Sequence, residues 1–344
     1  MKFFGKVLKT TVYFYSSAVL LFILLCSLDH LGLFSSSSIF FGLDCFQAPW
    51  LLIFIIPALC ACLILKNKKL SIVIFTVYII FFLFYGDISI ARHHTAEKDS
   101  KKISVLALNV QYYHRGTDTV IKKIKEINAD VTLLSENVLK EEELKYVTGE
   151  LKPWYFFAGK PEETAVISKY PFIVCKEVEF PSFQASLWGG NTVESIKNNP
   201  HRSFVHGVIN LQGKRLNIIS VRFIAGRAAG DSTGEQIKWG QYILKTQMEE
   251  VKFFREYISK LDGPVIFGGD LNGPPGSKLI KELNKFAIDS YMANNLYGKA
   301  TFNTEFPFLR LDYIFCINLL PVKSNVLNDI VSDHFPLYSE FMFE

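Results

Sequence analysis

The chain has 344 residues, 49% of them hydrophobic, and a formal net charge of +4 at pH 7. This mild charge is spread along the chain, so it gives little support to a nucleic-acid partner held by a basic stripe. The hydrophobic excess lies in the first ninety residues, so the two parts of the chain are expected to occupy different solvents. The six cysteines form no CxxC pair and no spacing typical of a zinc site.

Three apolar stretches occupy the N-terminal part, at residues 11–28, 50–65 and 71–90. Each is near the length needed to cross a hydrocarbon core of about 30 Å. We therefore predict a membrane domain of residues 1–90 with three transmembrane helices. A signal peptide followed by buried core helices is the alternative, but it would leave two further apolar runs unexplained.

Lysines around these stretches predict how the chain crosses the membrane. Three lysines precede the first stretch, and three more crowd the turn between the second and the third. The positive-inside rule then places the N-terminus in the cytoplasm, and three spans put the C-terminal domain on the extracytoplasmic side. Basic residues just after the third stretch, such as Arg92 and Lys98, argue the other way.

A polar segment without periodicity, residues 91–102, predicts a linker. Beyond it, short apolar runs suited to strands alternate with helix-like stretches, which indicates one α/β domain over residues 103–344. The clearest helices are expected at 117–128 and 236–261. Strands are expected at 103–110, 131–135, 164–168, 204–211, 215–223, 264–269 and 311–316.

Polar residues stand directly at the ends of the apolar strands, where a scaffold presents side chains to a cleft. One such residue alone is most often a turn former or a helix cap. Carboxylates, amides and one histidine, with no thiolate, are together the ligands that Mg²⁺, Mn²⁺ or Ca²⁺ prefer, and such ions neutralise phosphate charge. The residues are Asn109, Glu136, Asp270, Asn272, Asp312, Asp333 and His334.

The segment GGDLNGPPGS is the most specific of these patterns. Its two glycines let the backbone pass close to a ligand or a neighbouring strand, and Asp270 and Asn272 point to the same side of an extended chain. The segment SDHFP places an acid next to an imidazole, and Asp312 is available to fix the tautomer of His334.

Five short motifs in this order resemble the endonuclease/exonuclease/phosphatase superfamily of DNase-I-like hydrolases, over about residues 103–342. They are LNV with Asn109, SEN with Glu136, GDLN with Asp270, RLDYIF with Asp312 and SDH with His334. The resemblance implies an α/β four-layer sandwich, in which two mixed β-sheets lie face to face with helices outside. This architecture agrees with the alternation of strands and helices.

The resemblance also implies a divalent metal, Mg²⁺ or Mn²⁺. Glu136 would be its principal ligand, with Asn109 beside it and Asp333 as a further contributor. Gln111 stands where some family members place a second acidic ligand, which makes a second metal site less expected.

The same resemblance assigns the catalytic roles. Asp270 would activate or align the attacking water, and Asn272 would hold a phosphate oxygen. His334, oriented by Asp312, would be a general base or a phosphate-binding imidazole. The reaction would be an in-line attack of water on phosphorus. Whether Asp270 or His334 takes the proton stays open at this point.

Arg222 departs from the family pattern, because many members have histidine in this strand. Arginine binds phosphate well but cannot act as a general acid near neutral pH. The residue is either a substrate contact or a surface residue outside the site. Arg227 and Arg202 are weaker candidates for substrate contact.

These features favour a membrane-anchored hydrolase of phosphoric esters, a phosphodiesterase, nuclease or phosphatase. Its substrate is open among a lipid head group, nucleic acid and a small phosphorylated metabolite, and no obligate protein partner is evident. Selectivity is expected in the loops 180–202 and 225–240. The alternative is a non-catalytic, membrane-tethered scaffolding protein that retains the fold.

Overall fold

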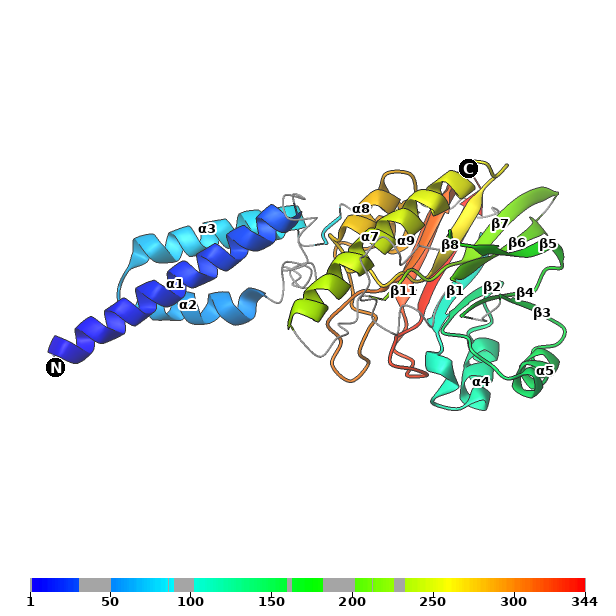
Figure 1. Cartoon of the computed structure of the whole chain (residues 1–344), viewed down its shortest axis with the longest axis horizontal. Helices are drawn as coiled ribbons and strands as arrows, with labels where there is room; N and C mark the ends of the chain where they lie inside the picture. The colour runs from blue at the N-terminus through cyan, green and yellow to red at the C-terminus, as the bar shows by residue number, and fades with distance from the viewer. Residues whose placement is uncertain are drawn as a thin grey trace.

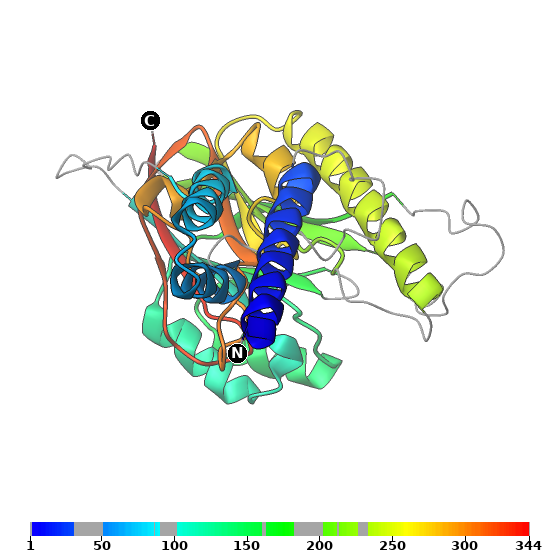
Figure 2. The same cartoon turned by 90° about the vertical axis from the view of Figure 1, so that its left-hand side faces the viewer.

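The computed structural model describes residues 2–30, 51–85, 87–89, 102–159, 163–181, 202–211, 213–225 and 233–343. A group of N-terminal helices extends from one side of a larger two-sheet domain (Figure 1). Seen from the side of these helices, α1 crosses in front of the domain (Figure 2).

The N-terminal helices form where the apolar stretches predict them. Ile23 and Ile55 are among the residues buried between the helices. The outer surface is apolar as well: Phe14 is 78% exposed and Ile64 is 75% exposed. A bundle that is apolar both inside and outside is typical of a lipid environment. The helices are α1 (Lys2–His30), α2 (Leu52–Ile64) and α3 (Lys68–Tyr85).

The expectation of three membrane-spanning helices is not met. Among the described residues one helical segment, Lys6–Leu28 in α1, is long and apolar enough to cross a membrane. Helix α2 has 13 residues, and at about 1.5 Å per residue it is shorter than a hydrocarbon core of about 30 Å. Helix α3 has lysines at 68 and 69, so its apolar part is shorter than its full length.

The C-terminal domain contains two six-stranded mixed sheets. In each sheet one central pair is parallel, β1 with β2 and β7 with β8, and the other pairs are antiparallel. The first sheet has, in spatial order, β11 (Leu319–Val326), β12 (Leu337–Phe343), β1 (Lys102–Asn109), β2 (Val131–Ser135), β4 (Thr164–Ser168) and β3 (Tyr155–Ala158). The second has β5 (Phe172–Glu179), β6 (Ser203–Leu211), β7 (Lys214–Ser220), β8 (Val265–Asp270), β10 (Asp312–Ile317) and β9 (Ile288–Asp289).

The two sheets pack face to face, and helices cover their outer faces (Figure 1). Strand β1 shows why: Val105 joins the core between the sheets, while Leu106 joins the core under the helices of the first sheet. The predicted four-layer arrangement is therefore confirmed. The covering elements are α4 (Thr117–Ile127) and α5 (Glu141–Glu150) on the first sheet, and α7 (Thr233–Ile258) and α8 (Lys278–Asn284) on the second. Helix α9 (Ser290–Asn294) and the 3₁₀ turn η3 (Gln111–Tyr113) complete the order.

The seven expected strands and the two clearest helices all form, with ends that move by at most three residues. Strand β7 ends at Ser220, so Arg222 lies beyond its end and not within it. Five strands and three short helices were not anticipated. Of the strands, β3 and β9 are too short to show a period, and β5 and β11 mix apolar and polar residues without strict alternation.

A short segment after α3 joins the sandwich directly. Ile88 forms a β-bridge with Tyr297, and the backbone N–H of Gly298 donates to the Asp87 carbonyl oxygen at 3.0 Å. The Asp87 carboxylate binds Arg310 through both oxygens, at 3.1 and 3.2 Å. Contact with the domain therefore begins before the expected linker, whose residues 91–101 lie outside the described part of the chain.

Candidate active site

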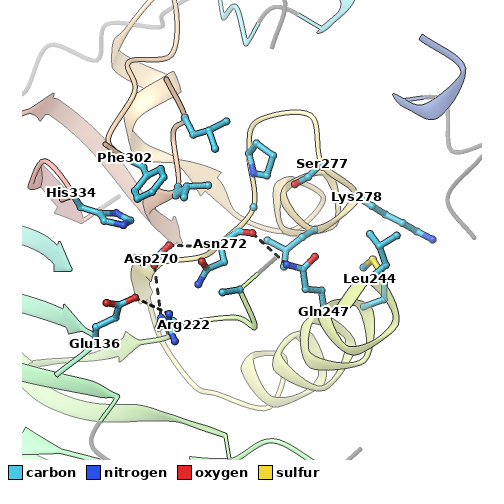
Figure 3. A pocket seen from close by; sticks show the side chains of 17 residues that line it. Glu136, Arg222, Leu244, Gln247, Asp270, Asn272, Ser277, Lys278, Phe302 and His334 are labelled. Carbon is cyan, nitrogen blue, oxygen red and sulfur yellow. Dashed lines mark hydrogen bonds and ion pairs between the residues drawn. The ribbon is translucent and has the colours of Figure 1, made fainter. Parts of the chain in front are cut away.

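The polar residues at the strand ends come together at one end of the sandwich. They lie where β2, β8 and β10 end or begin and where the chain follows β7. A cavity of about 180 Å³ opens there (Figure 3). Its lining includes Glu136, Arg222, Asp270, Asn272 and His334.

The glycines before Asp270 bring β8 close to its neighbours. A Cβ atom on Gly269 would lie 2.6 Å from the carbonyl oxygen of Val221 and 2.7 Å from Ser135 Oγ. The φ angle of Gly269, +135°, is also one that other residues rarely adopt. The backbone N–H of Asp270 donates to Ser135 Oγ at 2.9 Å, which ties the two sheets together at the site. The predicted close approach is thus to a neighbouring strand.

The Asp270 carboxylate lies at the centre of the cluster. It accepts a hydrogen bond from Asn109 Nδ2 at 3.1 Å and one from the Asn272 backbone N–H at 3.0 Å. Burial raises the pKa of Asp270 above its usual range, although the neighbouring His334 and Arg222 favour its charged form. A carboxylate with a raised pKa is a better proton acceptor than an ordinary aspartate.

His334 and Asp312 form the expected pair. His334 Nδ1 lies 2.7 Å from Asp312 Oδ2, and His334 is 4% exposed. The ring of Phe302 lies 4.9 Å from the imidazole, centroid to centroid. Burial alone would lower the pKa of His334, but Asp312 and Asp270 outweigh it and raise that pKa to about 9. This environment favours the protonated imidazole.

Arg222 occupies the opposite corner of the cluster (Figure 3). Its Nη2 donates to Glu136 Oε1 at 2.8 Å, its Nε lies 3.8 Å from Asp270 Oδ2, and its Nη1 lies 3.6 Å from Glu163 Oε2. Only 9% of Arg222 is exposed, so the surface alternative is wrong. The Nε atom is buried, and none of the described residues forms a hydrogen bond with it.

Arg202 binds the backbone of Arg222. Its Nη2 donates to the Arg222 carbonyl oxygen at 2.9 Å, and its Nε donates to Glu250 Oε1 at 2.5 Å. Arg202 is therefore a positioning residue in this structure. Glu163 and Glu250 are contacts that the sequence did not reveal, since Glu163 precedes an expected strand instead of following one, and Glu250 is one of many charges on α7. Arg227 lies outside the described residues.

Two residues of the site adopt left-handed backbone conformations that only glycine and asparagine adopt readily. The φ angle of Glu136 is 55°, and that of Asn272 is 52°. Asn272 Nδ2 donates to the Phe223 carbonyl oxygen at 2.9 Å, which fixes the turn after β8. Such conformations are typical of functional sites, where the surrounding structure holds a side chain in place.

The chemistry of the cluster fits a divalent cation. Its carboxylates outnumber its cationic side chains, and burial of unpaired negative charge is costly. Two buried carboxylate oxygens, Asp312 Oδ1 and Asp333 Oδ1, have no hydrogen-bond partner among the described residues. Hard oxygen atoms of this kind are the ligands that Mg²⁺ and Mn²⁺ prefer.

The atoms that lie closest together are not the predicted ligand set. One ligand atom each of Asp270, Asp312 and His334 lies within 4.8 Å of the others. Of the predicted ligands, Glu136 is bound to Arg222, and Asn109 Oδ1 accepts from the Gln111 backbone N–H at 2.8 Å. The predicted ligand set therefore stays a prediction.

The comparisons with known proteins agree with this architecture. The model of the endonuclease/exonuclease/phosphatase family matches residues 106–334. An α/β sandwich with polar residues at these strand ends defines a DNase-I-like hydrolase fold. The chain belongs to the endonuclease/exonuclease/phosphatase family. No curated protein matches the sequence.

Solved structures share the fold at low sequence identity. A family member from Bacteroides vulgatus is 14% identical, with a TM-score of 0.54, over 71% of this chain and 100% of that one. A mannosyl-6-phosphatase from Bacteroides thetaiotaomicron is 16% identical, with a TM-score of 0.53, over 70% and 100%. TDP2 from D. rerio, in complex with a single-strand DNA product, is 15% identical, with a TM-score of 0.51, over 70% and 99%. At these identities the likeness concerns the fold alone.

Proposed function

We propose that the chain is a membrane-anchored, divalent-metal-dependent hydrolase of phosphoric esters that works by in-line attack of water. The observation that carries this proposal is the single cavity that Asp270, His334, Glu136 and Arg222 share. Proton acceptor, proton donor and anion-binding groups meet there within one small volume, as phosphoester hydrolysis requires.

Asp270 is the better candidate for the proton acceptor, and His334 for a cationic group that faces the phosphate. Burial raises the pKa of Asp270, whereas the carboxylates around His334 raise its pKa to about 9. Two groups whose environments separate their protonation states in this way suit paired acid and base roles. Asp312 would hold His334 through Nδ1, leaving Nε2 for the substrate or the leaving oxygen.

Glu136 would hold the metal, with Asn109 and Asp333 as further ligands. When bound, Mg²⁺ or Mn²⁺ supplies positive charge that stabilises the phosphate oxygens in the transition state. The trio of Asp270, Asp312 and His334 suits acid–base work better, since His334 and Asp312 already bind each other. A Glu136→Gln variant should weaken Mn²⁺ binding, measured by calorimetry, more than Asp312→Asn does. If Asp312→Asn weakens Mn²⁺ binding more than Glu136→Gln does, Asp270, Asp312 and His334 form the metal site instead.

Arg222 would bind a phosphate oxygen of the substrate. Arg222 lines the cavity, and among the described residues its guanidinium makes one hydrogen bond, to Glu136, so donors remain for a phosphate. This role accounts for an arginine at a position where histidine is common in the family. Asn272 would contribute a further polar contact from the turn after β8.

Helix α1 would anchor the protein in a membrane. The segment Lys6–Leu28 is long and apolar enough, and the outward apolar surface of the helical bundle supports the same conclusion. With Lys2, Lys6 and Lys9 on the cytoplasmic side, one crossing by α1 carries the catalytic domain to the extracytoplasmic side.

The test is hydrolysis by the purified full chain with Mg²⁺ or Mn²⁺ and with EDTA. The panel would hold plasmid DNA, RNA, phospholipids and bis-nitrophenyl phosphate, beside a Glu136→Ala/His334→Ala double variant. We expect metal-dependent turnover that the double variant lacks. Intact substrates throughout, with a folded protein in metal, would contradict the proposal.

One observation favours the alternative of a non-catalytic scaffold. The Glu136 carboxylate, the main predicted metal ligand, is bound to Arg222 at 2.8 Å. If the ion pair between Glu136 and Arg222 blocks the metal site, Mn²⁺ should not bind the wild-type chain. An Arg222→Met variant should then gain Mn²⁺ binding without any gain in hydrolysis.

A further inference from the structure

The cavity at the site extends well beyond the catalytic groups. Figure 3 shows Leu244 and Lys278 on the far side of Asn272 from His334. We name the aliphatic lining that α7, α8 and the chain next to them contribute to this cavity the apolar arm. It is formed by Ala225, Leu244, Met248, Pro274 and Leu279.

Two polar side chains beside the apolar arm, Gln247 and Ser277, already have partners within the protein. Gln247 Nε2 donates to the carbonyl oxygens of Ile224 and Asn272, at 2.9 and 3.3 Å. Ser277 Oγ accepts from the Ile280 backbone N–H at the start of α8. A ligand group in the arm would therefore meet aliphatic surface and few spare hydrogen-bonding atoms, which suits an apolar group.

The arm lies on the side of the sandwich that faces the membrane helices. It is bounded by α7 and α8, and Figures 1 and 2 show both helices on that side of the domain. The surface next to the end of α3 is apolar too, since Leu296 is 62% and Tyr297 is 66% exposed. Ile88, which bridges to Tyr297, links this surface to the chain that leaves α3.

From these observations we infer that the site takes a phosphate ester carried by a membrane lipid. The phosphate lies between Arg222 and His334, and the apolar chain lies in the arm toward the bilayer. Lys278, exposed on α8, lies beside the arm, where it can meet head-group phosphates. This inference rests on the proposed function and names its substrate class.

Other phosphate esters fit the arm less well. A sugar or a nucleotide would bury hydroxyl or amide groups against the Leu244, Met248 and Leu279 side chains, and buried polar groups without partners are costly. A soluble ester with an apolar group shares the chemistry of the lipid, so the experiment must separate these two sources.

The first measurement is binding, which needs no turnover. Alkyl phosphonates of increasing chain length are added to the full chain in lipid nanodiscs with Mn²⁺, and binding is followed by thermal stabilisation. Each methylene that enters the arm should tighten binding about fourfold. This gain in affinity with chain length should be lost in the Leu244→Gln variant and in the Ala225→Phe variant, whose larger side chain fills the arm. It should persist in Ile173→Gln, where an aliphatic residue 48% exposed on β5 is changed.

The second measurement is turnover of methyl, butyl and octyl p-nitrophenyl phosphates, which share one leaving group. Hydrolysis of phosphatidic acid or phosphatidylglycerol in phosphatidylcholine vesicles is measured in parallel. Rates that rise with chain length and include the vesicle lipids support the inference. If octyl esters are hydrolysed while the vesicle lipids stay intact, the arm takes soluble esters. The inference that the substrate is a membrane lipid is then wrong.

Binding that does not depend on chain length, or that Leu244→Gln leaves unchanged, overturns the inference even if short esters are hydrolysed. Chain-length-dependent binding without hydrolysis of any ester would instead contradict the proposed catalytic function while the lipid site stands. The two failures are therefore distinguishable.

Discussion

Two buried arginines of the same domain both lie among carboxylates but differ in how many of their guanidinium nitrogens are hydrogen-bonded. All three guanidinium nitrogens of Arg310 are bound: Nε and Nη2 to Asp87, and Nη1 to Asp289 at 2.8 Å. Its guanidinium also lies 4.3 Å from the Tyr313 ring centroid. Among the described residues, Arg222 makes one side-chain hydrogen bond, to Glu136; its Nε has no hydrogen-bond partner there, and its contacts with Asp270 and Glu163 are longer, at 3.8 and 3.6 Å.

The difference shows how to tell a structural arginine from a functional one. Arg310 is 2% exposed and satisfied within the protein, so its charge serves the fold. Arg222 lines the cavity, and in the function proposed above its remaining donors would bind an anion. The two arginines are alike in burial and charge. They differ in which guanidinium nitrogens are hydrogen-bonded to the protein.

Replacing Arg310 should give the largest effect. Arg310→Met removes the cation that two largely buried carboxylates share, Asp87 and Asp289, so the free energy of unfolding should fall by about 3–5 kcal/mol. Thermal unfolding followed by tryptophan fluorescence would measure it. The matched control is Arg215→Met, an exposed arginine on β7, expected within about 0.5 kcal/mol of wild type. Equal stability of the two variants would refute a structural role for Arg310.

Arg222→Met should instead act on catalysis and on the metal. Loss of the phosphate contact should lower kcat/KM about a hundredfold, or about 2.7 kcal/mol. Since Glu136 is freed from its ion pair, added Mn²⁺ should raise the melting temperature more than it does in wild type. A variant that responds to Mn²⁺ as wild type does would show that Arg222 and the metal do not compete for Glu136.

Asp87 tests whether the segment after α3 belongs to the domain. Asp87→Asn keeps the shape but weakens a bidentate ion pair, and we expect a loss of about 1–3 kcal/mol in unfolding free energy. A soluble domain that begins at residue 98 should be less stable than one that begins at residue 86, by a similar amount. Equal melting temperatures of these two domains would place the domain boundary at the expected linker.

A buried histidine without a carboxylate partner should give the smallest effect. Burial lowers the pKa of His206, whose ring nitrogens contact Tyr257 Oη and Asn217 Oδ1. Below about pH 6.5 the unfolded chain binds a proton that the native state resists, so stability should fall as pH falls through this range. The difference in melting temperature between wild type and His206→Gln should therefore shrink on acidification. A difference that is constant from pH 8 to 5 would contradict the lowered pKa.

Sequence reasoning anticipated the central strands and missed the outer ones, which are the four edge strands and β12. Strands such as β2 and β8 are buried on both faces and read as continuous apolar runs. Strand β5 has mixed burial, so its residues follow no clear period. The three-span prediction failed for a related reason: apolar composition marks the stretches, but helix ends decide whether each is long enough.

For the site, the sequence alone determined which residue types stand at the strand ends, because short apolar runs followed by Asp, Asn, Glu or His can be read along one chain. It also determined the family, from five motifs in order. Only the tertiary structure decided that Arg222 is bound to Glu136, that Arg310 is satisfied by Asp87, and that an apolar arm adjoins the catalytic groups. These contacts join residues 86 or more positions apart, and no local pattern encodes which distant side chains share a cavity.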